Sequence, residues 1–205
     1  MAPELNAWTE MAARAYGAYA GINDAIKKAR AADGSVAHHA SEIRQQMIMM
    51  ALIRSFAVMD RDARVSFQSV YRFLHTPNAL NELAESYAKS EPASSVDSAL
   101  ATCAAAKTKF LVAYRAINFK SLGRMQSFRN SGIAHITMPD IEKARVTYTE
   151  IEKLVLSCCE LAGQLTLMVS GRNDWPKEHL DDAFDVAYAF WLEAITAHSE
   201  GRIAL

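Results

Sequence analysis

The chain has 205 residues, of which 51% are apolar and 22% charged, and its formal net charge is −1. This length suits one domain with a hydrophobic core, and the composition excludes a disordered chain. Only 8 glycines and 5 prolines are present, which disfavours a turn-rich sheet protein, so we expect a single all-α domain over residues 1–205.

The first half of the sequence predicts two long helices and two shorter ones. The first long helix covers residues 4–32, because apolar residues recur at three- and four-residue intervals, at Leu5, Trp8, Ala12, Ala15, Tyr19, Ile22 and Ile26. Ser35 can cap the second, whose apolar residues include Ile43, Met47, Met50, Ile53 and Phe56. Shorter helices are expected over residues 66–75 and 79–89, separated by a Thr-Pro-Asn turn.

The second half predicts three long helices. The first runs from residue 96 to about residue 128, after a loop-like Ser- and Pro-containing stretch. The next begins near Thr137–Asp140, where a hydroxyl cap precedes an acid, and continues to Ser170. A turn over residues 171–176 leads to the last helix, over residues 176–198. Together these elements predict a bundle of four or five main helices with short connecting helices.

Membrane spans, disulfides, metals and cofactors are not expected. The N-terminus lacks the basic and apolar regions of a signal peptide. The apolar stretch Leu154–Val169 is interrupted by Glu160 and Gln164, as in a buried helix rather than a membrane span. The cysteines have no zinc-ligand spacing and no even number, so we predict small buried side chains in a reducing cytoplasm for Cys103, Cys158 and Cys159.

The nearly neutral net charge hides a basic segment. No acidic residue occurs between Asp97 and Asp140, and the basic residues in this interval are Lys107, Lys109, Arg115, Lys120, Arg124 and Arg129. The rest of the chain has 16 basic and 23 acidic residues, a net charge of −7. An acid-free basic helix on an acidic body produces a focused positive field that suits a phosphate backbone. The alternative is an amphipathic helix whose long cations lie along the edge of the core.

Helix geometry places these cations around one apolar stripe. At about 100° per residue, the stripe of an unbroken helix contains Phe110, Tyr114, Ile117, Ser121, Met125 and Phe128. One flank carries Lys109, Lys120 and Arg124, and the other carries Lys107, Arg115 and Arg129. The residues predicted to bind a nucleic-acid phosphate backbone are therefore Lys107, Lys109, Arg115, Lys120 and Arg124.

Arg129 and His135 lie at the end of this segment, with five residues between them. The chain has 13 arginines and 6 histidines, so a bare pair at this spacing is expected about once by chance. A second pair, Arg172 and His179, lies among acidic residues and contains a proline. Its acids suit a helix N-terminus and would repel phosphate, whereas the surroundings of Arg129 would attract it.

The full string is Arg129-Asn130-Ser131-Gly132-Ile133-Ala134-His135. An arginine, a polar residue and an alanine-histidine pair at the end of a long helix resemble the signature of the HEPN superfamily, and most closely its abortive-infection branch named after the AbiU system. The upstream blocks Leu52–Arg54, Met59–Asp62 and Val65–Phe67 are also similar to the second helix and following turn of that branch. In residue detail the resemblance is confined to these short stretches.

This resemblance implies a HEPN-like helical domain, usually a homodimer, that often acts as a metal-independent endoribonuclease. In phage defence such a toxin can be held by an antitoxin or another regulatory protein. In this chain His135 would take the proton from a 2′-hydroxyl, and Arg129 would stabilise the charge on the phosphate. Asn130 would orient the phosphate or the imidazole. The substrate would be RNA, because only RNA has the attacking hydroxyl.

Geometry adds a condition to this assignment. On an unbroken helix, Arg129 and His135 would lie about 120° apart and would not face one pocket. Either Gly132 bends the helix, or two protomers combine their residues in one cleft, or both. Two other hypotheses stay open: a catalytically silent HEPN-like module that binds RNA, a nucleotide or a protein, and a plain partner-binding bundle.

Other candidate residues have simpler explanations. His38, His39 and Glu42 have the types of a metal site, but a solvated helix start explains them better. The same holds for His179 with Asp182. The nine methionines are best explained as core filler or as a dimer face. Neither a glycine-rich phosphate loop nor a nucleophile elbow is present.

Overall fold

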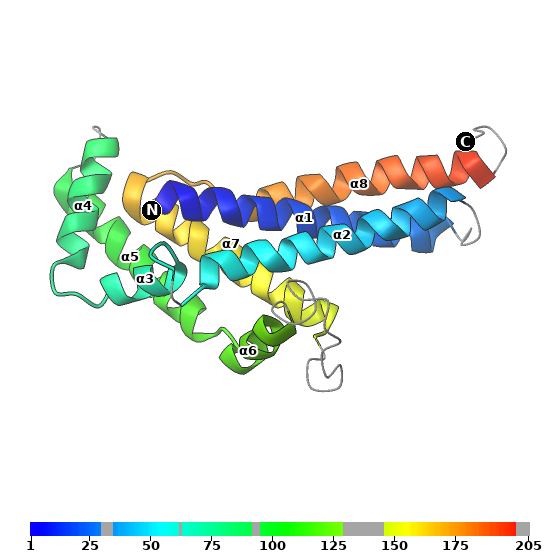
Figure 1. Ribbon diagram of the computed structural model, residues 1–205. Coiled ribbons are helices and arrows are strands. Elements are labelled where there is room, and N and C mark those ends of the chain that lie inside the picture. The colour runs from blue at the N-terminus through cyan, green and yellow to red at the C-terminus, as the bar shows by residue number, and fades with distance from the viewer. Residues whose placement is uncertain (30–34, 62, 92–94, 129–145, 200–205) are drawn as a thin grey trace.

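The protein is all-helical over the residues that the computed structural model describes, which are 1–29, 35–61, 63–91, 95–128 and 146–199. Within these ranges there are eight helices and no strand (Figure 1). The helices are α1 (Ala2–Ala29), α2 (Ser35–Met59), α3 (Phe67–Phe73), α4 (Ala79–Ser90), α5 (Val96–Arg115), α6 (Phe119–Phe128), α7 (Tyr148–Ser170) and α8 (Pro176–Ser199). The expected all-α class is confirmed.

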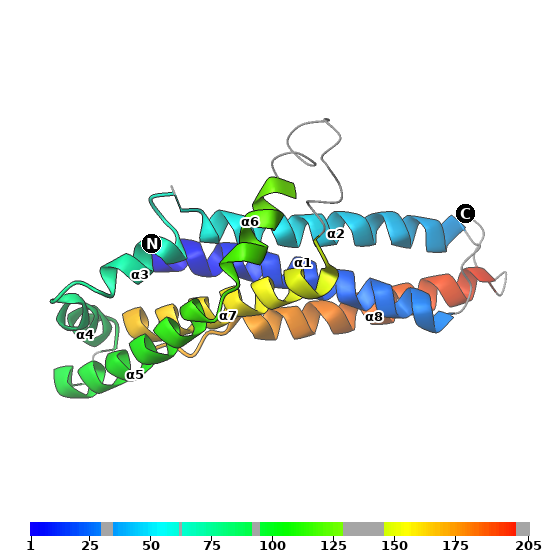
Figure 2. The same cartoon turned by 90° about the horizontal axis from the view of Figure 1, so that it is seen from below.

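Helices α1, α2 and α8 lie side by side along the length of the molecule, and both views show them together (Figures 1 and 2). The most extensive contact is between α1 and α8, followed by that between α1 and α2. Two glycines of α1 permit a close approach to α8. A Cβ atom at Gly17 would overlap the carbonyl oxygen of Leu180, and one at Gly21 would overlap that of Phe184. The two backbones therefore approach closely where α1 has no side chain.

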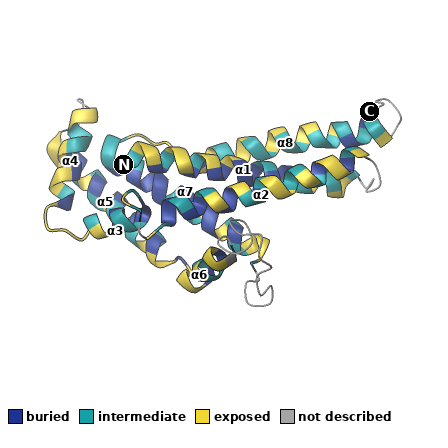
Figure 3. Ribbon diagram, in the orientation of Figure 1, coloured by how far each residue is buried: buried dark blue, intermediate teal, exposed yellow. Residues whose placement is uncertain are grey.

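Helix α7 lies at the centre of the main core. It packs against α1, α2, α4, α5 and α8, and its buried residues include Leu154, Val155, Leu161, Leu165 and Met168. Buried positions follow α7 through the middle of the molecule in Figure 3. A smaller cluster of Ile22, Ala37, Ala40 and Ile195 joins α1, α2 and α8 at their far end. These contacts explain why the most apolar helix in the sequence is an interior one.

The predicted helices of the first half are confirmed with shifts of a few residues at their ends. Ser66 caps α3 through a capping box with Ser69.

Three apolar residues expected on inner faces are partly exposed instead: Trp8 is 39% exposed, Met50 42% and Ile53 38%. Trp8 stacks under the guanidinium of Arg54, 4.2 Å from the ring centroid. This cation–π contact gives the indole a partner at the surface.

The predicted long helix over residues 96–128 is wrong, because it is broken after Arg115. Ala116 ends α5, and its backbone N–H bonds the Tyr114 and Val112 carbonyls. Asn118 then starts α6: its side-chain oxygen accepts the Ser121 backbone N–H at 3.0 Å, which is an N-cap bond. Figure 2 shows α6 turning away from the axis of α5. The expected apolar stripe is nevertheless buried on both sides of the break, at Phe110, Tyr114, Ile117, Ser121 and Met125.

The predicted start of the following helix also needs correction. Thr137–Asp140 lies outside the described residues, but Val146 and Thr147 are not helical and α7 begins at Tyr148. Thr147 is the N-cap, and it forms a capping box with Glu150. A continuous helix from residue 140 to residue 170 is therefore excluded. The cap satisfies backbone N–H groups that would otherwise have no partner in the first turn.

Several smaller expectations can be compared with the structure. All three cysteines are buried and free. Helix α7 is long and apolar enough to be a candidate membrane span, with a mean hydropathy of 1.2, but 56% of that window is buried inside the protein. His38 and His39 each lie beside Glu42 at the exposed start of α2. No group of three potential metal ligands occurs in the described ranges.

Candidate functional site

The three predicted catalytic residues, Arg129, Asn130 and His135, lie outside the described residues, as does Gly132. The structure describes the two helices that flank this segment. Helix α6 ends at Phe128, directly before Arg129, and the described chain resumes at Val146, two residues before α7. The geometry around the candidate site is therefore that of α6 and the first turn of α7.

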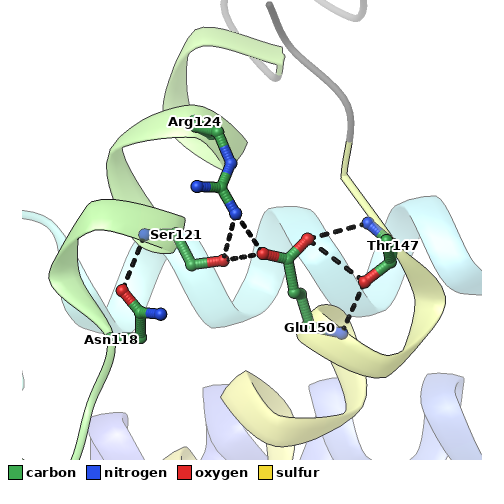
Figure 4. A network of polar contacts seen from close by, with 5 residues as sticks. All are labelled: Asn118, Ser121, Arg124, Thr147 and Glu150. Atoms are coloured by element: carbon green, nitrogen blue, oxygen red, sulfur yellow. Dashed lines mark hydrogen bonds and ion pairs between the residues drawn. The ribbon is translucent and has the colours of Figure 1, made fainter.

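A polar cluster joins these two flanking helices (Figure 4). We call it the α6–α7 clasp, and it consists of Asn118, Ser121, Arg124, Thr147 and Glu150. Glu150 is its centre: one carboxylate oxygen accepts hydrogen bonds from the Ser121 hydroxyl and from Arg124. The other oxygen accepts the Thr147 backbone N–H at 2.9 Å and the Thr147 hydroxyl at 3.1 Å. The clasp thus connects residues 26 positions apart in the chain.

The same contacts keep Glu150 ionised. The Ser121 hydroxyl, the Thr147 backbone N–H, the Thr147 hydroxyl and the charge of Arg124 together lower the pKa of the Glu150 carboxyl from 4.5 to about 2, against a smaller opposing effect of burial. The carboxylate side chain is 22% exposed and the Arg124 side chain 37%. Glu150 therefore carries its charge at neutral pH and holds Arg124 as an ion pair.

The position of the clasp matters for the candidate site. Arg124 lies five residues before Arg129, and Thr147 lies just after the end of the undescribed segment. The clasp fixes the two chain ends from which residues 129–145 extend. Because Arg124 is already paired with Glu150, it is less available to a phosphate than an unpaired cation would be. Sequence reasoning did not find Glu150, since nothing local in the sequence connects it to Arg124.

The other four predicted RNA-binding residues are Lys107, Lys109, Arg115 and Lys120. Lys107 is half-buried and the other three are exposed. None of the four forms an ion pair within the described part of the chain. The break at residues 116–118 means that Lys120 does not continue the flank of α5 on which Lys109 lies. The cations are thus distributed over two helices of different direction.

A cavity of about 310 Å³ lies where α5, α6 and α7 meet. Its walls come from the break between α5 and α6 and from the first turns of α7, and its lining includes Ser121 and Glu150 of the clasp. The cavity was not predicted, because the sequence was interpreted as one unbroken helix over residues 96–128. The signal that could have found it is Asn118, a good N-cap residue in front of a new helical turn.

The second Arg/His pair has the structural role expected of it. Arg172 is exposed in the turn before α8, and His179 lies in the first turns of α8. The His179 ring contacts Arg14 at 3.0 Å and lies 3.7 Å from Glu10, so it joins α8 to α1. This pair is far in sequence from the basic segment.

Compared with known proteins, the chain matches no family model, no curated protein and no solved structure.

Proposed function

We propose that the protein is a metal-independent endoribonuclease of the abortive-infection or toxin type, with a HEPN-like fold. The observation that carries this proposal is the basic segment that leads to Arg129. Over residues 98–128 the chain has no acid, and four of its cations have no ion pair among the described residues. Such unpaired positive charge is the electrostatic footprint of a site for a polyanion.

The clasp adds to this electrostatic argument. Among the described residues, Glu150 is an acidic group in direct contact with α6, and its charge is compensated by Arg124 and by three hydrogen bonds. A paired carboxylate weakens the positive field much less than a free one would. The phosphate of an RNA strand can therefore approach α6 from the side of Lys120. A basic approach of this kind also raises the rate at which the strand is captured.

The chemistry needs three groups, and the proposed roles are those that the residue types allow. His135 takes the proton of the 2′-hydroxyl, and the 2′-oxygen attacks the adjacent phosphorus. The bond from phosphorus to the 5′-oxygen breaks, and that oxygen takes a proton from an imidazolium or from water. Arg129 stabilises the charge on the phosphate and Asn130 orients it. The products are a 2′,3′-cyclic phosphate and a 5′-hydroxyl, and no metal takes part.

We propose further that the site is completed in a cytoplasmic homodimer, with an antitoxin or another regulatory protein as a third partner. The support is the separation of Arg129 and His135 on a regular helix, which calls for a bend or for a second protomer. Mass measurement by light scattering tests the dimer. A monomer that cleaves RNA at full rate would contradict the two-protomer cleft.

The cleavage test uses purified protein, structured and unstructured RNA, and a chelator. The wild type is compared with Arg129→Ala and His135→Ala, and each should reduce cleavage by at least a hundredfold. Arg172→Ala and His179→Ala are the matched controls, because they change the same residue types in the second pair. Absence of cleavage by the wild type, or equal cleavage by all variants, would contradict the nuclease. Binding without cleavage would favour the silent HEPN-like module.

A salt titration tests the basic segment separately from catalysis. RNA affinity should fall steeply with salt, with a log–log slope of about 0.7 for each phosphate contacted on a single strand. Changing Lys109→Gln and Lys120→Gln together should reduce that slope by about 1.4. Lys28→Gln, an exposed lysine at the far end of α1, is the control. An unchanged slope in the double variant would exclude these lysines as phosphate contacts.

A further inference from the structure

The cavity between α6 and α7 has an apolar floor. Ile117 and Met125 contribute from the α5–α6 side and Leu154 from α7. These side chains are 9%, 2% and 5% exposed, so the surfaces that they offer to the cavity belong to the protein core. A volume of about 310 Å³ lies at the lower end of the range for pockets that hold small organic molecules. A single nucleobase with part of its ribose fits this space.

The polar groups at the rim have an uneven hydrogen-bonding capacity. Glu150 has none left, since each of its two oxygens already accepts two hydrogen bonds. The Asn118 oxygen accepts from the Ser121 backbone, and the Asn118 side-chain NH₂ group donates to no described residue. Lys153 lines the cavity and forms no ion pair within the described ranges. Asn118 and Lys153 thus offer donors, and the Asn118 oxygen keeps a second lone pair that can accept.

Ser157 offers a further acceptor at the rim. The Ser157 hydroxyl donates to the Lys153 carbonyl oxygen at 2.7 Å, and its oxygen keeps lone pairs that can accept. The cavity therefore combines an apolar floor with donors of Asn118 and Lys153 and with acceptors of Asn118 and Ser157 at its edge. Arg115 directly precedes the first residue that lines the cavity. Lys120 lies in the sequence between the lining residues Asn118 and Ser121. Both are exposed, and neither forms an ion pair with a described residue, as a neighbouring phosphate would require.

We propose that this cavity binds one unstacked base of a single-stranded RNA, and that it prefers a base with carbonyl oxygens on its edge, such as uracil. This inference rests on the proposed RNA substrate and adds its class: single strands or loops, because a base inside a duplex cannot enter. Protein recognition of RNA sequence uses such splayed bases, which are hydrogen-bonded on their edges. Uracil has two carbonyl oxygens and one N–H group on its edge, whereas cytosine has one carbonyl oxygen, an acceptor ring nitrogen and an amino group. A rim rich in donors, such as those of Asn118 and Lys153, therefore suits uracil better.

Binding is measured with His135→Ala protein, so that the RNA is not consumed whether or not the wild type is a nuclease. The probes are fluorescent ten-residue oligomers of uridine and of cytidine, read by anisotropy. We expect tighter binding of the uridine oligomer, by about fivefold, which is the effect of one or two hydrogen bonds. Equal affinity for the two oligomers would overturn the base preference.

Filling the cavity tests its occupancy. Ser157→Tyr places a ring in the cavity and should weaken binding of the uridine oligomer at least fivefold. Ser170→Tyr is the matched control, because both serines lie on α7 and both donate to the carbonyl oxygen four residues earlier. Circular dichroism and thermal unfolding confirm that the variants are folded. If a folded Ser157→Tyr protein binds RNA like the control, the cavity is not the base site, even where cleavage is observed.

Asn118→Asp tests the donor specifically. Aspartate retains an oxygen for the Ser121 backbone N–H and so retains the cap of α6, but it replaces the free NH₂ group by an acceptor. The preference for uridine over cytidine should then be lost or reversed, while an unchanged preference would contradict the role of Asn118. Free uridine monophosphate serves as competitor. If it binds as tightly as the oligomer, the site is one for a free nucleotide, and the RNA-positioning inference is overturned.

Discussion

Two contacts between helices in this protein are built in opposite ways. Helices α1 and α8 meet along their length, and their backbones approach where Gly17 and Gly21 have no side chain. Helix α6 is joined to α7 through hydroxyls, a guanidinium and one carboxylate. At these glycines the first contact depends on shape, whereas the second depends on charge and hydrogen bonding.

This difference divides the molecule into a rigid frame, formed by α1 and α8, and an adjustable region around the α6–α7 clasp. A close-packed contact without space for a methyl group has one arrangement, and small changes in volume disturb it. A polar clasp at a partly exposed site responds to pH, to salt and to a competing anion. The residues flanking the proposed catalytic segment are held by the second type. The comparison predicts large, pH-independent effects at α1–α8 and smaller, pH-dependent effects at the clasp.

The largest effect is expected for Gly17→Ala. The added methyl group would overlap the Leu180 carbonyl oxygen, which is backbone and cannot rotate away. We expect the free energy of unfolding to fall by about 3 kcal/mol, measured by urea denaturation at pH 7. A variant as stable as the wild type would show that α1 and α8 can separate without cost, and the contrast between the two contacts would disappear.

Glu150→Gln should cost about 2 kcal/mol at pH 7, because it removes charge-assisted hydrogen bonds while keeping the shape of the side chain. The pKa of Glu150 is lowered from 4.5 to about 2 in the folded protein. Its contribution is therefore fully present above the pKa of the unfolded chain, and is lost as the pH falls through the folded-state pKa. The difference from the wild type should shrink between about pH 5 and pH 2.

The control for this change is Glu85→Gln on α4. Glu85 is exposed and forms no ion pair in the part of the chain that the structure describes. Its replacement should leave stability within about 0.5 kcal/mol of the wild type. A Glu150→Gln effect that stays constant from pH 7 to pH 3 would contradict a role for the ionised carboxylate.

Thr147→Ala should lower the free energy of unfolding by about 1 kcal/mol, because the cap of α7 and two hydrogen bonds to Glu150 depend on this residue. One of those two bonds comes from the backbone and can survive the substitution. Thr147→Ser keeps the hydroxyl and should restore most of the loss. Thermal unfolding measures both variants, and equal losses for alanine and serine would exclude the hydroxyl as the cause.

The smallest effect, and one of opposite sign, is expected for Gly123→Ala. Gly123 lies inside α6, and a Cβ atom there would meet nothing within 4 Å. Alanine should stabilise the helix by roughly 0.5–1 kcal/mol through its greater propensity. The same substitution type therefore has opposite signs at Gly17 and Gly123. Destabilisation at Gly123 would show that α6 contacts a further surface in solution.

The positions of the first helices in the chain could largely be predicted from the sequence. Spacing of apolar residues and the helix starts expected at Ser35 and Ser66 placed the first helices within a few residues, because both signals are local. The outward position of Trp8 could not be predicted, since its partner Arg54 comes from another helix. The same holds for Gly17, whose need for a small residue depends on how α8 lies across it.

The region around the candidate site was harder to predict. An apolar stripe with a regular period continues through residues 110–125, and it conceals the break, because the buried residues keep their spacing on both sides. The start of α7 was placed too early because the sequence has a hydroxyl followed three residues later by an acid twice, at Thr137 and at Thr147, and α7 begins after the second. The link from Arg124 to Glu150 is a tertiary contact without a local signal. The catalytic assignment of Arg129, Asn130 and His135 stays a prediction.

The buried thiols of α7 have a practical consequence. Burial raises the pKa of Cys159 to about 12 and that of Cys158 well above its usual value, so neither reacts readily with a thiol reagent while the helix is in place. Cys103, on α5, is also fully buried, and its pKa is raised by burial. The rate at which these three thiols react with a reagent would therefore report how often the interior of the protein opens. A surface cysteine could be labelled selectively, without first replacing the natural ones.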